Sequence, residues 1–147
     1  MAALIAVPPP LTTQAHEVGY QPSAYTGRYY EQRWEGLREC IGQREGRWNY
    51  SGTGSHGRYV GTYQFTRPLA QGATWMMEKE WQTLYGSKTA RAMRYKLQHI
   101  DPTKWSRTVW DQAFWTVLSW NGSLSGLKHW NGGRYHCLNA SPSNSHS

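Results

Sequence analysis

The chain has 147 residues, a length typical of one domain. Its 16 Lys and Arg residues outnumber its 9 acidic residues and give a net charge of +7, which favours an acidic partner: nucleic acid, anionic lipid or an anionic cell-wall polymer. The longest apolar runs fall far short of the roughly 18 residues of a transmembrane helix, so we expect no membrane-spanning segment.

Residues 1–30 show no regular hydrophobic period and are interpreted as an extended arm. Three consecutive prolines from Pro8 favour a polyproline conformation, and the stretch up to Tyr30 is expected to be ordered only where it docks on something. The apolar stretch from Ala2 to Val7 is too short for an export signal, and no basic residue precedes it. We therefore expect a mature form, or a chain that leaves the cell by lysis or inside a particle.

A helix is predicted from about Tyr30 to Glu45. Trp34, Leu37 and Ile41 recur at the spacing of one helix face, and extending the pattern by four residues places Glu45 along the buried stripe.

Gly46 is expected to end this helix. Arg44 points about 100° away from its neighbour on a helix, so we expect no ion pair with Glu45. The other acids of this predicted helix, Glu31, Glu35 and Glu39, are interpreted as solvated charges beside arginines.

Residues 48–50 are expected to be extended, and residues 51–57 form a glycine-rich turn. Alternating side chains over residues 58–65 predict a small β-hairpin. Three more helices follow. Thr66 is expected to cap the first and Ser87 the second, and the third starts near Ser106 or Arg107. Their expected apolar residues include Leu69, Ala73, Met76, Ala90, Met93, Leu97, Trp110, Phe114, Val117 and Leu118.

These elements predict an α+β fold that is mostly helical, with one small β-hairpin wing. The folded domain is expected to span residues 31–138, followed by a loose tail of residues 139–147. Cys40 and Cys137 stand near its two ends. A bridge between them would contribute about 4–5 kcal/mol in the chain-entropy model, and two free buried thiols are the alternative.

Glu45 has the sequence context that best fits a general acid, since Trp48 and Tyr50 follow it. Apolar surroundings keep a carboxylic acid protonated near neutral pH. The simpler alternative is a helix-end acid in a salt bridge. Glycosidases usually need a second carboxylate, but Asp101 and Asp111 are more simply a turn residue and an exposed helix acid.

The motifs around Glu45 resemble a known family. The stretch from Glu39 to Tyr50, the Gly61-Thr-Tyr-Gln-Phe-Thr66 segment and Thr74-Trp75 resemble the transglycosylase-like domain of actinobacterial resuscitation-promoting factors and, more broadly, lysozyme-like lytic transglycosylases. That family has a Glu-Ser-Gly-Gly-Asn-Trp/Tyr core, then Gly-x-x-Gln-Phe, then Thr-Trp.

Glu45 matches the family's catalytic acid, and the stretch from Trp130 to Cys137 is similar to the end of related actinobacterial and actinophage domains. The resemblance covers about residues 31–137. Gly46 departs from the usual serine, the hairpin loop differs in length, and Cys40 stands five positions before Glu45 instead of directly before it.

The resemblance implies peptidoglycan cleavage at the MurNAc-GlcNAc β-1,4 bond by one glutamic acid, which first donates a proton and then accepts one from the sugar's 6-hydroxyl. It also implies a Cys40–Cys137 disulfide and glycan strands as the partner, with no cofactor or metal. The expected substrate-binding residues are Asn49, Tyr50, Tyr59, Tyr63, Gln64 and Trp75.

An extracellular or virion-associated location is expected, for instance in a phage tail, with the arm contacting other virion proteins. Neither a nucleic-acid partner nor membrane insertion is expected. One alternative is a non-catalytic wall-binding or structural virion protein with a lysozyme-like fold, and another is a nucleic-acid binder, based on charge alone. His129, His136 and Cys137 lack the spacing of a zinc site. The basic helix positions Arg91, Arg94 and Lys96 are interpreted as a solvated face rather than a phosphate contact.

Overall fold

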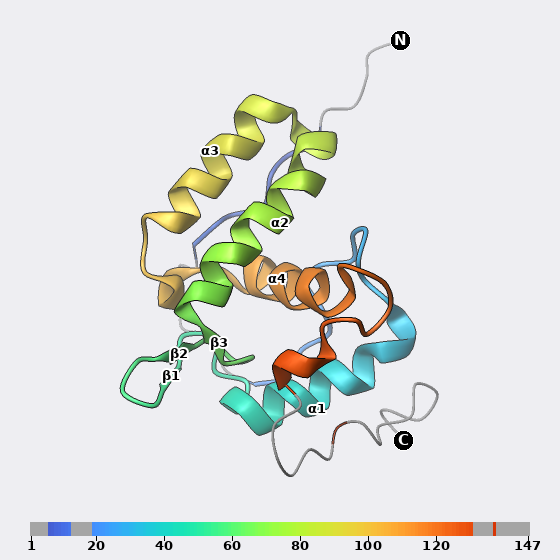
Figure 1. Cartoon of the computed structure of the whole chain (residues 1–147), viewed down its shortest axis with the longest axis vertical. Helices are drawn as coiled ribbons and strands as arrows, with labels where there is room; N and C mark the ends of the chain where they lie inside the picture. The colour runs from blue at the N-terminus through green and yellow to red at the C-terminus, as the bar shows by residue number, and fades with distance from the viewer. Residues whose placement is uncertain (1–5, 13–18, 131–136, 138–147) are drawn as a thin grey trace.

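The structure, a computed structural model, describes residues 6–12, 19–130 and 137 (Figure 1). The predicted α+β, mostly helical class is confirmed. In chain order the elements are η1 (Gln32–Trp34), α1 (Glu35–Gly46), β1 (Thr53–Gly54), β2 (Tyr59–Val60), β3 (Phe65–Thr66), α2 (Arg67–Tyr85), α3 (Ser87–Gln98), η2 (Pro102–Lys104), α4 (Arg107–Ser119) and η3 (Leu127–Trp130).

Helix α4 forms the centre of the core. Figure 1 shows it between the α2–α3 pair and α1, and every residue from Val109 to Ser119 is buried. The ring centroid of Trp110 lies 5.2 Å from that of Phe65, and the ring of Phe114 lies 4.9 Å from that of Trp130. The core therefore joins the helices to the sheet and to η3.

The predicted hairpin wing is an antiparallel sheet in the order β1-β2-β3, each strand only two residues long. Val60 of the middle strand pairs with Thr53 on one side and with Phe65 on the other. The sheet leads directly into α2, because the Oγ1 atom of Thr66 accepts a hydrogen bond from the backbone N–H of Leu69 (3.1 Å). The predicted Thr66 cap is thus confirmed.

The described part of the N-terminal arm packs against the helices of its own domain. The Tyr25 hydroxyl donates to Glu80 of α2 (2.6 Å), and the backbone N–H of Ala24 donates to Asp111 of α4 (2.8 Å). Nearer the N-terminus, the backbone N–H of Ser106 donates to the carbonyl of Leu11 (2.9 Å). We call residues 19–30 the strap, because they run across α1, α2 and α4.

A disulfide joins Cys40 of α1 to Cys137, with the two Cα atoms 5.5 Å apart. This confirms the bridge and excludes the alternative of two free thiols. It fastens residue 137 to the helix that carries Glu45. The expected tail, residues 139–147, lies outside the described residues.

Two acids that were expected to be exposed are buried instead. Glu35 pairs with Arg38 one turn along α1, and Arg38 also lies 3.4 Å from Oδ1 of Asp111. Arg38 and Asp111 have no exposed side-chain surface. The interpretation of Glu35 as a solvated helix charge and of Asp111 as an exposed acid is therefore wrong, because both carboxylates pair with the buried guanidinium of Arg38.

No helix in the described ranges is long and apolar enough to span a membrane.

Candidate active site

Glu45 stands in the last turn of α1, where the chain reverses in a left-handed conformation. Arg47 and Trp48 adopt φ angles of +52° and +56°, and the N–H of Trp48 donates across six positions to the carbonyl of Gly42 (3.2 Å), which satisfies a carbonyl at the helix end. Gly46 lies so close to the sheet that a Cβ there would sit 2.4 Å from the Cα of Thr62. The end of α1 is thus pressed against the β2–β3 turn, and only glycine fits at the contact.

An open pocket of about 250 Å³ lies between this helix end and the sheet. The described residues of its lining are polar or glycine, and none of them is aromatic: Glu45, Gly46, Arg47, Asn49, Gly52, Thr53, Gly54 and Gln64. Three predicted site residues, Glu45, Asn49 and Gln64, therefore meet here. Of the lining residues, Glu45 alone carries a carboxylate.

The amides of Asn49 and Gln64 are each held at one end. Oδ1 of Asn49 accepts from the N–H of Ser51 (3.1 Å), and Nε2 of Gln64 donates to the carbonyl of Gly61 (2.8 Å). Gln64 itself has a φ of +51°. No described residue bonds to Nδ2 of Asn49 or Oε1 of Gln64. One donor and one acceptor therefore remain for a ligand with hydroxyl and amide groups.

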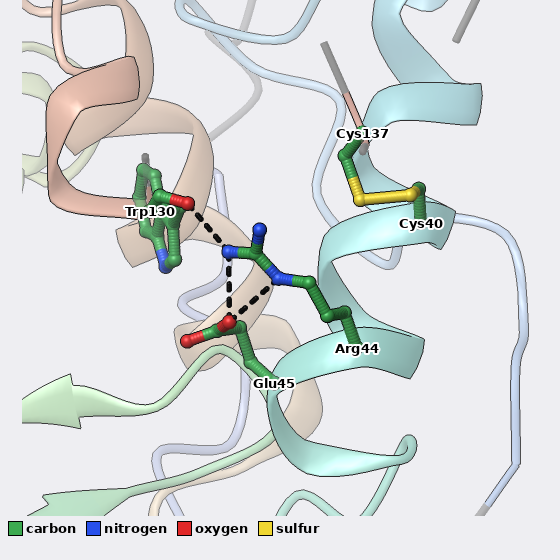
Figure 2. The surroundings of a disulfide bond; sticks show 5 residues. All are labelled: Cys40, Arg44, Glu45, Trp130 and Cys137. Carbon is green, nitrogen blue, oxygen red and sulfur yellow. Dashed lines mark hydrogen bonds and ion pairs between the residues drawn. A yellow bond between two sulfur atoms is a disulfide. The ribbon is translucent and has the colours of Figure 1, made fainter. Parts of the chain in front are cut away.

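Arg44 forms an ion pair with Glu45, so the prediction that it would not is wrong. The ion pair has two contacts, and both are to Oε2 of Glu45: Nε of Arg44 lies 2.8 Å from it and Nη2 lies 2.7 Å from it. The helix does turn the two Cα–Cβ bonds apart, but the long arginine side chain reaches back, and Nη2 also donates to the carbonyl of Trp130 (Figure 2). This contact with η3 holds the guanidinium beside the carboxylate.

The other carboxylate oxygen of Glu45 is free of such contacts. Figure 2 shows Oε1 pointing away from Arg44, and no described residue donates a hydrogen bond to it. The Glu45 side chain is 26% exposed, so it lies at the rim of the core and not fully along the buried stripe. One oxygen is thus held and the other faces outward.

Tyr50 and Tyr63, expected to contact substrate, lie in the core. Both hydroxyls donate to Oδ1 of Asp111 at 2.6 Å, and Arg38 donates to the Tyr63 hydroxyl (2.8 Å). Burial raises the pKa of Asp111, and Arg38 opposes this shift. These tyrosines join the sheet and its preceding turn to α1 and α4, and neither lines the pocket.

Tyr59 and Trp75 are likewise absent from the pocket lining. Tyr59 lies half-buried on β2. Trp75 lies on α2 with the Arg94 guanidinium of α3 at 3.8 Å over its ring. None of the four aromatic residues expected to bind substrate therefore lines the pocket.

Among the residues that the structure describes, no second carboxylate lines the pocket of Glu45. Asp101 caps η2 and pairs with Arg67 (3.5 Å), and the N–H of Thr103 lowers its pKa. Asp111 is enclosed in the buried network. In the described ranges no group of three His, Cys, Asp or Glu residues could hold a metal ion.

Sequence reasoning missed Thr53 and Gly54, which form the sheet side of the pocket. A Cβ at Gly54 would lie 2.3 Å from Oε1 of Gln64, so a larger residue there would displace the Gln64 amide from the pocket. The glycine-rich turn over residues 51–57 was the feature of the sequence that could have indicated this side of the pocket.

Comparisons of the chain with protein-family models, curated proteins and solved structures gave no match.

Proposed function

We propose that this protein cleaves peptidoglycan glycan strands, with Glu45 as the general acid and base. The observation that carries the proposal is the placement of Glu45 in a polar pocket, where it is the only carboxylate among the described lining residues and its Oε1 atom is bonded to no described residue. A single residue that donates and then accepts a proton needs such an accessible oxygen.

The resemblance gains support from backbone conformation. The family core has two glycines after the serine, and the matching residues here are Arg47 and Trp48. Both have positive φ angles, which favour glycine. Asn49 and Gln64, taken from two separate motifs, also line the same pocket as Glu45.

In the proposed reaction, protonated Glu45 donates its proton from Oε1 to the oxygen linking MurNAc to GlcNAc, and the GlcNAc side leaves with that proton. The carboxylate then accepts the proton of the MurNAc 6-hydroxyl as that oxygen bonds to C1, which closes a 1,6-anhydro ring without water. Arg44 stabilises the carboxylate between the two steps. Asn49 and Gln64 orient the sugar through their remaining amide atoms.

The ion pair also favours a second candidate, a wall-binding or structural virion protein without turnover. A guanidinium 2.7 Å from the carboxylate occupies one of its two oxygens. In this alternative the pocket binds glycan, and Arg44 holds Glu45 in place as a hydrogen-bond acceptor for sugar hydroxyls.

The proposal includes a location outside the cell or in a virion. A Cys40–Cys137 disulfide persists most readily in oxidising compartments. Mass spectrometry of purified virions should detect the chain, whereas a cleaved export signal on a longer bacterial precursor would contradict the virion assignment.

The test is digestion of purified peptidoglycan by the wild type and by Glu45→Gln, with products weighed by mass spectrometry. Anhydromuropeptides from the wild type alone support the proposal, and products heavier by one water indicate hydrolysis by the same residue. If neither protein yields products but both sediment with the wall, the binding alternative holds.

A further inference from the structure

Helix α3 lies in a stretch without negative charge. From Trp81 to Ile100 the chain contains no Asp or Glu, but it carries four cationic side chains: Lys88, Arg91, Arg94 and Lys96. Any carboxylate that offsets their charge must therefore come from another part of the chain.

Ion pairing leaves most of these charges uncompensated. Arg94 pairs with Glu78 of α2 (3.0 Å). Lys88, Arg91 and Lys96 have no carboxylate within 4.0 Å among the described residues, and all three are exposed. The outer side of α3 is therefore positively charged.

Two large aromatic rings are exposed beside these charges. Trp75 is 55% exposed and carries the Arg94 guanidinium over its ring, and Tyr95 is 60% exposed and stacks on His99 with 3.9 Å between centroids. Arg91 lies three residues before Arg94 and four before Tyr95, so it is a neighbour of both on the helix surface. We call Trp75, Lys88, Arg91, Arg94, Tyr95 and His99 together the α3 face.

We propose that the α3 face binds an anionic polymer of the cell wall in which phosphodiesters link sugar or polyol units. The uncompensated cations suit the phosphates, and an exposed ring suits the apolar face of a sugar. A ligand that offered only negative charge would not need the exposed rings, and an uncharged sugar would not need the excess of cations. The choice of a wall polymer rests on the proposed function.

This surface is separate from the Glu45 pocket. Figure 1 shows α3 and α1 at opposite ends of the molecule along the vertical axis of the view. A polymer bound to the α3 face therefore leaves the Glu45 pocket open. It also keeps the protein attached to the insoluble wall between cleavage events. Binding and cleavage can then be measured independently.

The test compares sedimentation with intact walls for two double variants in the Glu45→Gln background, which prevents digestion. Lys88→Gln/Arg91→Gln removes two charges from the α3 face. Arg28→Gln/Lys104→Gln removes the same charge from exposed residues elsewhere that have no carboxylate within 4.0 Å in the described ranges. Tyr95→Ala tests the exposed ring.

We expect the α3 double variant to bind walls about tenfold more weakly, with a shallower dependence on salt, and the control to bind like its parent. Tyr95→Ala should also weaken binding. Walls stripped of phosphodiester polymer by hydrofluoric acid should bind the parent and the α3 variant equally. Equal binding of both double variants to intact walls would overturn the proposal.

Turnover separates this inference from the proposed function. With Glu45 restored, the α3 double variant should digest soluble glycan fragments at the wild-type rate. No turnover by any protein would defeat the proposed catalysis while leaving the wall-binding result intact. Duplex DNA bound more tightly than intact walls, and lost in the α3 variant, would reassign the face to nucleic acid.

Discussion

At the scale of single residues, Arg44 fixes the position of the Glu45 carboxylate through an ion pair. Both side chains are about three-quarters buried, so solvent screens the pair only partly. Arg47 also lines the pocket, but it is exposed and has no ion pair with a described carboxylate. The two arginines therefore form a matched pair for mutation.

We expect Arg44→Gln to slow digestion of peptidoglycan by about tenfold, because the Glu45 carboxylate loses the charge-assisted hydrogen bonds that hold it in the pocket. Arg47→Gln should leave the rate almost unchanged. The measurement is the rate of product release by the three proteins. Equal rates for wild type and Arg44→Gln would show that the ion pair does not position the acid.

Gly46 gives a second prediction at this scale. Gly46→Ala places a methyl group against the backbone of Thr62, so we expect a loss of about 1–3 kcal/mol in the free energy of unfolding. A methyl group added at Gly72 on α2 would have no other atom within 4 Å, so Gly72→Ala should stabilise by about 0.5–1 kcal/mol. Urea unfolding measures both. Equal stability of the two variants would contradict the close contact.

At the scale of elements, the strap behaves as part of the domain. Glu80 is 7% exposed and is held by neutral donors, namely the Tyr25 hydroxyl (2.6 Å), the N–H of Arg28 (2.9 Å) and, more weakly, Gln112 (3.4 Å). A buried carboxylate depends on such bonds, because its charge has lost the solvation of water. The strap therefore contributes to the stability of α2.

We expect Tyr25→Phe to lower the free energy of unfolding by about 1–3 kcal/mol, because it leaves the Glu80 carboxylate short of one donor. Tyr95→Phe is the matched control, since the Tyr95 ring is 60% exposed and its hydroxyl bonds to no described residue. Chemical denaturation of the three proteins tests this. If Tyr25→Phe leaves the denaturation midpoint unchanged, the strap adds little to the stability of the fold.

At the scale of the whole molecule, the disulfide closes most of the folded chain into one loop. The two cysteines are 97 residues apart, so the chain-entropy model gives about 4–5 kcal/mol of stabilisation. Replacing both, as Cys40→Ser/Cys137→Ser, should lower the free energy of unfolding by that amount. The reduced wild type should unfold like the double variant, and a wild type insensitive to reductant would contradict the prediction.

Sequence periodicity was enough to predict the helices. The apolar stripes of α3 and α4 and the cap at Thr66 are local patterns, and the structure confirms them. The expected cap at Ser87 is wrong, because Ser87 is the first residue of α3 and Gly86 stands at the cap position. The candidate site was predicted in part, because Glu45, Asn49 and Gln64 meet in one pocket. Tyr50 and Tyr63 were expected beside them, since aromatic residues near a motif look alike whether they face a ligand or the core.

The sequence by itself determined the helical class, the Thr66 cap and the short list of acids, because helix periodicity, capping and composition involve residues close together in the chain. Only the tertiary structure decided which polar groups are buried. Tyr50 meets Asp111 across 61 positions, and Arg44 meets the carbonyl of Trp130 across 86. Partners so distant, reached by long side chains, are set by how the elements pack, which no local pattern records.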